Sequence, residues 1–287
     1  MNPRALPALA LVFNAFTWGV SWWPFRQFQQ AGLHALWVTT FTFTVAVIGL
    51  LVARPAALRE LLRTPTMWVL MLAAGLTNAC FNWAVTIGDV VRVVLLFYLM
   101  PLWAVLLARP LLGERIGPRE LLRVALALAG AAVVLWPAEA ELLAPVGLAD
   151  ALAVIGGFTF ALNNVMLRRE AHRSQPGRAL AMFSGGVLVS LLLAAVQTHS
   201  GLIAAPSAQG WVWPLAVAGL AAWFVVSNLA LQYGAARLRS HTTAVIMISE
   251  VVFAAFSALL LGAGTLSPAL AVGGALIVTA ALLAAID

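Results

Sequence analysis

Amide side chains recur at helical spacing within the longest apolar runs of the sequence. Asn78 and Asn82 stand four residues apart, and Asn228 and Gln232 repeat this pair in the second half of the chain. Residues four apart lie on one face of a helix. Because polar groups are costly in hydrocarbon, such stripes either join neighbouring helices by hydrogen bonds or line a pathway for a polar molecule.

Two further apolar runs carry the same kind of pattern. Asn14, Thr17 and Ser21 share one face of the first run, and Thr159 and Asn163 occupy a corresponding run in the second half. A single Asn or Thr in a membrane helix is most often an interhelical hydrogen-bonding group. Together the four runs each present an amide or hydroxyl at corresponding places, and this set favours a polar-lined cavity.

Tryptophan is abundant, with eleven Trp against two Tyr. Those near the ends of apolar runs fit an interfacial belt, but Trp18, Trp83 and Trp223 lie well inside their runs. Trp18 is one turn from Asn14, and Trp83 follows Asn82. Indole walls beside amides would suit an apolar or aromatic side chain with polar contacts for its amino and carboxyl groups. Packing or lipid-facing indoles are the alternative.

One acid and one proline also stand inside predicted membrane helices. Glu250 is the acid deepest in an apolar run, and intramembrane acids are functional candidates by default. It could pair with a substrate ammonium or carry a proton; the alternative is a carboxyl bonded to a neighbouring helix near its end. Pro101 removes a backbone hydrogen bond and favours a kink, which is either a hinge or a static bend.

The elements that must position these residues are membrane helices. Of the 287 residues 63% are hydrophobic and 9% are charged, whereas soluble domains carry about 25% charged residues. The composition excludes a cytosolic enzyme and most nucleic-acid binders. Apolar runs bounded by charge, Pro or Gly predict an all-α membrane protein with ten transmembrane helices, near residues 5–25, 33–53, 66–87, 93–109, 120–136, 149–167, 179–197, 211–233, 243–261 and 269–286.

The arginines orient these helices. All sixteen basic residues are arginine, and they lie between the apolar runs. With the N-terminus in the cytoplasm, all of them except Arg26 and Arg92 fall on the cytoplasmic side, as the positive-inside rule requires. The pattern therefore predicts ten spans, a retained first helix and cytoplasmic N- and C-termini. The single cysteine, Cys80, excludes a disulfide framework and a cysteine-based metal site.

The two halves of the chain resemble each other. Phe16-Thr17-Trp18 recurs as Phe158-Thr159-Phe160, a shift of 142 residues, while Asn78 and Pro118 match Asn228 and Pro268 at a shift of 150. Five helices in each half place the second half in the opposite orientation. We expect two inverted five-helix repeats, residues 1–138 and 147–287, as in many secondary transporters with a substrate site near the membrane midplane.

The run from Gly88 to Trp103, followed by Gly113-Glu114-Arg115 and Pro118, resembles the helix-four signature of the drug/metabolite transporter superfamily, EamA type. It is especially similar to bacterial aromatic amino-acid exporters. The second half echoes it with Ser249-Glu250, but Val251 stands where many relatives have proline. The resemblance implies a ten-helix basket, alternating access, and a central cavity lined by the first, third, fourth, sixth, eighth and ninth helices.

The sequence therefore predicts a monomeric secondary transporter of the bacterial inner membrane that exports amino acids, aromatic and hydrophobic ones in particular. Other small metabolites or drugs, such as hydrophobic cations or nucleotide sugars, are the alternative. No nucleophile with its base and no metal-spaced cluster is present, so we expect no enzyme activity, cofactor, metal or nucleic-acid partner. The expected hinge is Pro101, and the expected substrate-binding residues are Asn14, Thr17, Trp18, Asn78, Asn82, Trp83, Tyr98, Thr159, Asn163, Asn228, Gln232 and Glu250.

Overall fold

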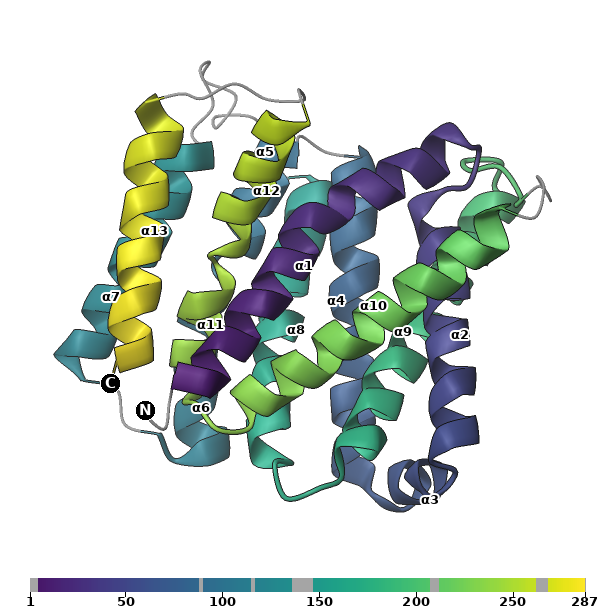
Figure 1. Cartoon of the computed structure of the whole chain (residues 1–287), viewed down its shortest axis with the longest axis horizontal. Coiled ribbons are helices and arrows are strands. Elements are labelled where there is room, and N and C mark those ends of the chain that lie inside the picture. Colours follow the sequence, from purple (N-terminus) through teal and green to yellow (C-terminus); the bar gives the residue numbers. More distant parts are fainter. Residues whose placement is uncertain are drawn as a thin grey trace.

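The computed structural model describes residues 5–87, 90–114, 117–135, 147–206, 212–261 and 268–286, and every regular element in these ranges is a helix (Figure 1). The first half contains α1 (Ala5–Gln30), α2 (Ala35–Ala53), α3 (Ala56–Arg63), α4 (Pro65–Ile87), α5 (Val90–Phe97), α6 (Met100–Leu112) and α7 (Pro118–Leu135). The second half contains α8 (Leu148–Arg169), α9 (Gln175–His199), α10 (Val212–Ala235), α11 (Ser240–Met247), α12 (Glu250–Leu260) and α13 (Pro268–Ile286).

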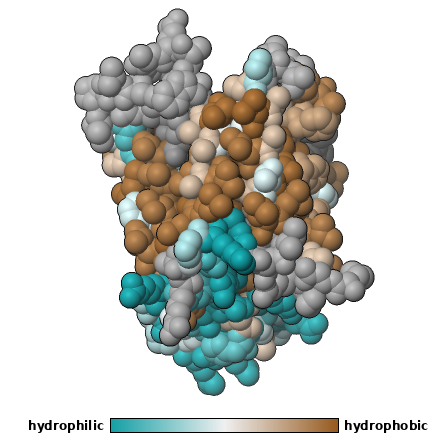
Figure 2. All heavy atoms as spheres, turned by 90° about the vertical axis from the view of Figure 1, so that its left-hand side faces the viewer, coloured by the Kyte–Doolittle hydropathy of each residue, from teal (hydrophilic) through white to brown (hydrophobic). Residues whose placement is uncertain are grey.

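The helices have the length and surface of a membrane protein. Seven segments of the described residues are long and apolar enough to cross a bilayer, and they lie in α1, α2, α4, α8, α9, α10 and the α11–α12 region. Hydrophobic residues cover the middle of the surface in Figure 2, and hydrophilic ones gather at the lower end. The chain is thus an all-helical, multi-pass membrane protein, as the composition predicts.

Three helical features differ from the sequence prediction. The helix predicted for 5–25 continues as α1 through Pro24 to Gln30. A short amphipathic helix, α3, follows α2; its buried face carries Ala57 and Leu61, and its charges exclude it from a search for apolar runs. The third difference is that the helices predicted for 93–109 and 243–261 are each divided in two.

Pro101 explains the first of these breaks. It lies at the start of α6, where the missing N–H breaks no helical bond. In one continuous helix this N–H would bond to the carbonyl of Phe97, four residues earlier, and the proline ring would clash there. The Phe97 carbonyl is covered instead by α8, since a Cβ added to Gly157 would lie 2.5 Å from its oxygen. The prediction of a kink within a continuous helix was therefore wrong: Pro101 begins a new one.

The second break, between α11 and α12, lies at Ile248 and Ser249. The Ile246 carbonyl accepts from the Ser249 backbone N–H at 3.0 Å and from the Ser249 hydroxyl at 2.7 Å, so the side chain competes with the helical hydrogen-bond pattern at this point. Gly19 of α1 packs here, with an added Cβ 2.7 Å from the Glu250 carbonyl oxygen. Both ends of α11 and the start of α12 stand 150 positions after the corresponding points of α5 and α6.

Helix packing relates elements of the two halves. In the first half α4 packs on α8 and α9, while in the second half α10 packs on α1 and α2. Likewise α5 and α6 contact α8, whereas α11 and α12 contact α1. Figure 1 shows α1 and α10 crossing the front of the molecule at an angle, with α4, α8 and α9 behind them. Helices from both halves therefore surround the space between these two layers.

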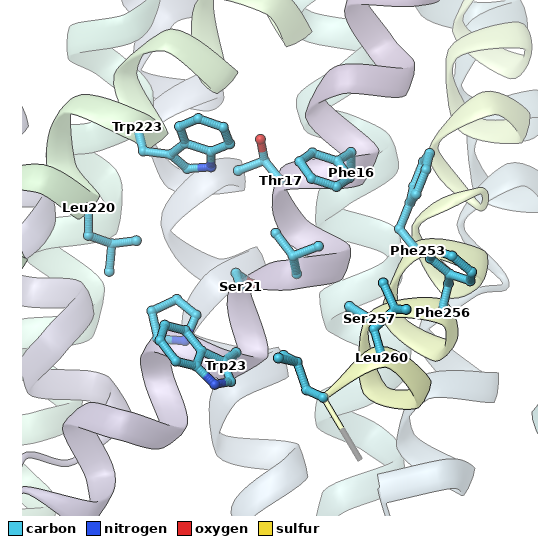
Figure 3. Close-up of a pocket in the computed structure, with 13 residues that line it drawn as sticks. Phe16, Thr17, Ser21, Trp23, Leu220, Trp223, Phe253, Phe256, Ser257 and Leu260 are labelled. Atoms are coloured by element: carbon cyan, nitrogen blue, oxygen red, sulfur yellow. The ribbon is translucent and has the colours of Figure 1, made fainter. Parts of the chain in front are cut away.

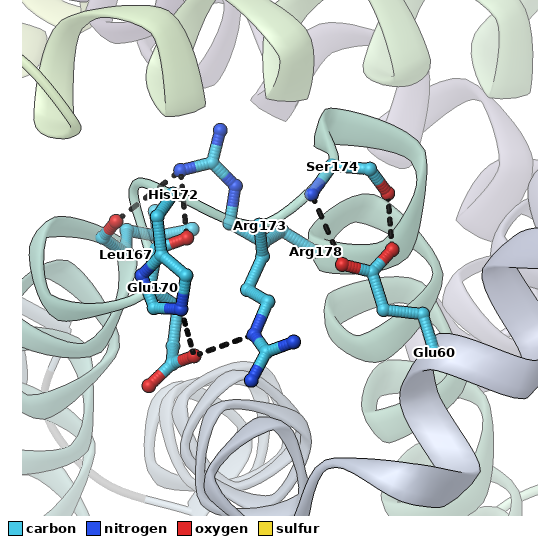
Figure 4. Close-up of polar contacts among 7 residues, drawn as sticks. All are labelled: Glu60, Leu167, Glu170, His172, Arg173, Ser174 and Arg178. Atoms are coloured by element: carbon cyan, nitrogen blue, oxygen red, sulfur yellow. Dashed lines mark hydrogen bonds and ion pairs between the residues drawn. The ribbon is translucent and has the colours of Figure 1, made fainter.

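Polar contacts join the halves at the lower end, where α3 lies (Figure 1). The Glu60 carboxylate of α3 accepts hydrogen bonds from Ser174, the N-cap of α9: from its backbone N–H at 3.1 Å and from its hydroxyl (Figure 4). A carboxylate at a helix N-terminus is favourable because it faces unpaired N–H groups. Nearby, the buried Arg178 side chain donates to the carbonyls of Leu167 and Glu170 at the end of α8.

Candidate functional site

A cavity of about 950 Å³ lies between the two layers of helices. This volume is at the upper end of the range of small-molecule sites. It is lined by α1, α2, α4, α5, α8, α9, α10, α11 and α12, together with the turn between α5 and α6. The wall reaches from Met247, at the end of α11, to Gln29 and Ala35 near the junction of α1 and α2. The cavity therefore extends from the helix breaks toward the end of the molecule opposite α3.

The structure brings eight of the twelve predicted binding residues to this cavity. They come from α1, α4, α8, α10, the α5–α6 turn and the first residue of α12: Asn14, Trp18, Asn78, Asn82, Tyr98, Asn163, Asn228 and Glu250. Of these, Asn14 holds α1 to α10, since its Nδ2 donates to the carbonyl and the hydroxyl of Ser227 at 2.9 and 2.7 Å. The polar wall is thus also part of the helix packing.

The amides on α4 and α10 are oriented by local bonds. Asn78 Nδ2 donates to the Ala74 carbonyl one turn earlier at 2.9 Å. Asn228 Nδ2 lies 3.3 Å from the Met182 sulfur, and Asn228 Oδ1 accepts from Gln232 Nε2 at 2.7 Å. Gln232 is fully buried behind Asn228 and does not line the cavity. It positions a lining residue instead of forming the wall.

Aromatic rings form one side of the cavity near α2, α9 and α10. Trp18 stacks on Phe224 with ring centroids 4.9 Å apart and an interplanar angle of 21°. Phe43 contacts both Phe224 and Phe183 edge to face, at 6.1 and 5.1 Å. All four rings line the cavity. Trp18 was predicted, but the three phenylalanines were not, since Phe in an apolar run gives no signal that separates a cavity wall from ordinary packing.

A second group of rings lies at the first helix break. Phe97 packs against Phe81 at 4.9 Å and against Phe160 at 5.8 Å. Its neighbour Tyr98 lies in the turn between α5 and α6 and is 5% exposed. These four residues line the cavity from α4, α5, the α5–α6 turn and α8. Rings from both halves therefore surround the amides.

The cavity wall has few charges. Among the described residues that line it, Glu250 is the one acid and Arg26 the one base. Glu250 is the first residue of α12 and directly follows the second break. Arg26 lies near the end of α1, about 10 Å along the helix axis from Gly19, which packs on the Glu250 backbone. A carboxylate thus lies deep in the cavity and a guanidinium near its upper end.

Three other predicted binding residues also lie outside the cavity. Thr17 is buried and donates to the Phe13 carbonyl at 3.1 Å, Thr159 receives a bond from the cavity residue Thr77 at 3.1 Å, and Trp83 packs in a cluster with Cys80 and others. Helix geometry explains these positions, since adjacent residues point about 100° apart.

Within the described part of the chain no group of three or more His, Cys, Asp or Glu side chains could hold a metal.

A second set of ionic contacts joins the halves below the cavity. Glu114, in the loop after α6, accepts from the Ser240 N–H at the start of α11 at 3.2 Å. Its carboxylate lies 4.0 Å from Arg168 Nε and 3.7 Å from His241 Nδ1. Glu114 therefore connects α6 to α8 and α11.

Glu114 is expected to make stability depend on pH. Burial raises the pKa of its carboxyl, opposed by the Ser240 N–H, Arg168 and Arg239. The folded protein therefore binds this proton more tightly than the unfolded chain, and this contribution to stability declines as pH rises through the folded-state pKa. We expect Glu114→Gln to remove this decline of the free energy of unfolding with pH, as measured from unfolding curves recorded in detergent between pH 4 and 8. An identical slope in wild type and variant would contradict the assignment, and Glu60→Gln serves as control.

Comparisons with known proteins agree with this architecture. Residues 5–136 match the EamA-like transporter family. An uncharacterized transporter of Pseudomonas aeruginosa is 36% identical over 107 residues, which cover 36% of this chain and 35% of that protein. The alignment thus spans about a third of the relative's length. A crystal structure of a protein with 23% sequence identity superposes with a TM-score of 0.76 over 97% of this chain and 96% of that chain, which shows a shared fold.

The comparisons point to transport and not to enzyme catalysis. They agree with the sequence resemblance to the drug/metabolite transporter superfamily and with the apolar helices of the structure. The chain is thus a multi-pass membrane protein whose residues 5–136 are similar to the EamA-like transporter family.

Proposed function

We propose that this protein is a secondary transporter of the EamA-like family that exports amino acids, aromatic and hydrophobic ones in particular, across the bacterial inner membrane by alternating access through the central cavity. The observation that carries the proposal is the wall itself: amides, two groups of aromatic rings and one carboxylate around about 950 Å³. Rings favour an apolar or aromatic side chain, while amides and the carboxylate offer partners to an α-amino group. A polyphosphate would need several cations, yet the described lining offers Arg26 alone.

The proposed topology has ten spans in two inverted repeats, residues 1–138 and 147–287, with both termini in the cytoplasm and a monomer as the working unit. Matching helix breaks 150 residues apart support it, as do the corresponding helix contacts of the two halves. Broken helices beside a central site are a common feature of inverted-repeat transporters. Pro101, at one break, is then part of the hinge between α5 and α6.

Counterflow in proteoliposomes tests the substrate. Vesicles loaded with unlabelled tryptophan should accumulate radiolabelled tryptophan, and unlabelled aromatic amino acids should compete. The measurement at two pH gradients separates proton-coupled from facilitated transport. Displacement by a cationic dye or a nucleotide sugar, with none by any amino acid, would favour the alternative substrates of the same superfamily.

Trp18→Ala is expected to weaken transport of tryptophan more than that of alanine. The indole lines the cavity and stacks on Phe224, so its loss removes ring contacts worth about 1.4 kcal/mol, or about tenfold in apparent affinity. The measurement is the concentration dependence of counterflow for both amino acids. Trp68→Ala, on α4 outside the cavity lining, is the matched control. An equal effect on both substrates would argue against a ring-binding role.

A further inference from the structure

A second concave site lies on the outer side of α1. We call it the lateral groove: a volume of about 480 Å³ between α1, α10 and α12. Figure 3 shows Leu220 and Trp223 of α10 on one side of α1 and Phe253 and Phe256 of α12 on the other. Phe256 is 56% exposed, so the groove opens on the surface of helices that are apolar enough to cross the membrane.

The lining of the groove is rich in aromatic side chains. It contains five rings: Phe16, Trp23, Trp223, Phe253 and Phe256. Phe16 and Phe253 meet edge to face with centroids 5.5 Å apart. Ring faces and edges bind other rings in defined geometries, beyond the gain from buried area. The groove therefore fits a planar aromatic group better than a flexible acyl chain.

The three hydroxyl groups of the groove are already bonded within the protein. Thr17 donates to the Phe13 carbonyl, Ser21 to that of Trp18 at 2.7 Å, and Ser257 to that of Ala254 at 3.0 Å. A carboxylate placed here would lose its hydration without gaining a hydroxyl donor. The groove therefore does not suit the carboxylate of a zwitterion, and its rings favour an apolar group.

The groove and the central cavity are separated by α1 alone. Ser21 lines both volumes. Two hydrogen bonds also join the two walls at Ser257 on the groove side: Trp22 Nε1 donates to Ser257 Oγ at 2.9 Å, and Ser257 Oγ donates to the carbonyl of the cavity residue Gly19 at 3.5 Å. Pro24 lies within α1 at this level and removes the backbone bond to Val20. The wall between groove and cavity is thus a helix that lacks one backbone hydrogen bond and is held to α12 at this level through Ser257.

We propose that the lateral groove is an entry site through which aromatic amines dissolved in the bilayer reach the central cavity. The ring binds in the groove, which α12 lines with Phe253 and Phe256. Glu250, on the cavity side of α12, is the partner for the ammonium. The inference rests on the proposed transport pathway for its last step, but binding in the groove does not require transport.

Photolabelling tests the binding step. The probe is a benzylamine with a diazirine on its ring, added to purified transporter in nanodiscs, with labelled peptides identified by mass spectrometry. We expect label on the groove faces of α1 and α12, competed by excess phenethylamine. Val20→Trp fills the groove and should lower this labelling about tenfold, the change expected from the loss of favourable ring contacts. Leu192→Trp, on the exposed face of α9, should leave it unchanged.

Three outcomes would overturn the proposal. The first is labelling spread evenly over other exposed faces such as that of Leu192. The second is labelling of the groove by a phospholipid that carries the diazirine on its acyl chain, with no displacement by phenethylamine. That result would identify the groove as a lipid site. The third is Val20→Trp labelled like wild type. Because the readout is binding, a protein that failed to transport tryptophan would still give a clear result.

A transport measurement then tests the entry step. Val20→Trp should slow uptake of radiolabelled phenethylamine delivered in the bilayer about tenfold relative to wild type, with tryptophan counterflow unchanged. Equal slowing of both substrates would indicate damage to the central pathway and contradict lateral entry. If wild type also showed no tryptophan counterflow, that result would contradict the proposed function. The photolabelling experiment alone would then decide whether the groove binds aromatic amines.

Discussion

Glu250→Gln is expected to lower transport at least about tenfold while the protein still folds. The side chain lines the cavity at the start of α12. Loss of one partner from a desolvated, charge-assisted contact costs about 2–5 kcal/mol, and each 1.4 kcal/mol is about tenfold in affinity. Gln keeps the shape and removes the charge, so the change tests ammonium binding and proton carriage together. The measurement is initial efflux and counterflow in proteoliposomes.

Two controls separate function from folding in this experiment. Glu250→Asp keeps the carboxylate and should retain more transport than Gln. Thermal unfolding in detergent should give similar midpoints for wild type and both variants. Unchanged rates for Glu250→Gln would remove Glu250 from the mechanism and leave it as a structural carboxyl at the helix break.

Gly185→Val is expected to prevent the close packing of α4 and α9. A Cβ at Gly185 would lie 1.8 Å from the Met71 carbonyl oxygen, and one at Gly75 would lie 2.4 Å from the Gly185 carbonyl. Both obstacles are backbone atoms, so no side-chain rotation relieves them. Overpacking of this kind costs about 3 kcal/mol or more, and close approach at small residues is a main source of helix association in membranes.

The comparison variant is Gly49→Val on α2, where an added side chain meets open space. Size-exclusion profiles and thermal unfolding in detergent should show loss of the monodisperse species for Gly185→Val and little change for Gly49→Val. A wild-type profile for Gly185→Val would mean that the two helices can separate without penalty. The same result for both variants would instead indicate a general intolerance of valine.

The sequence predicted most of the helix positions because apolar runs and their charged ends are direct signals of membrane helices. It did not predict that two helices are broken. A break of two residues leaves the apolar run intact, and its cause at Pro101 depends on Phe97 and on Gly157 of another helix. The short helix α3 was missed for the opposite reason: its Arg and Glu residues interrupt the apolar pattern.

The site was predicted in part for equally physical reasons. Asn78 and Asn82 both line the cavity because a spacing of four keeps them on one face. Trp83, one residue further, points about 100° away and packs with the Cys80 cluster. Proximity in sequence to a cavity residue was therefore misleading, whereas periodicity was informative. The walls of Phe43, Phe183 and Phe224 required the tertiary structure.

The helix breaks also affect how force passes through the molecule. A continuous helix moves as one rod, so a displacement at one membrane surface is carried to the other. At residues 98–99 and 248–249 the rods are interrupted beside the cavity. On one side of the breaks α5 packs on α8 and α12 on α1, and on the other side α6 packs on α8 and α11 on α1, while α6 and α11 contact each other. Each break thus removes one direct helical connection between the two ends, and the unbroken helices α1 and α8 remain as the elements that connect them.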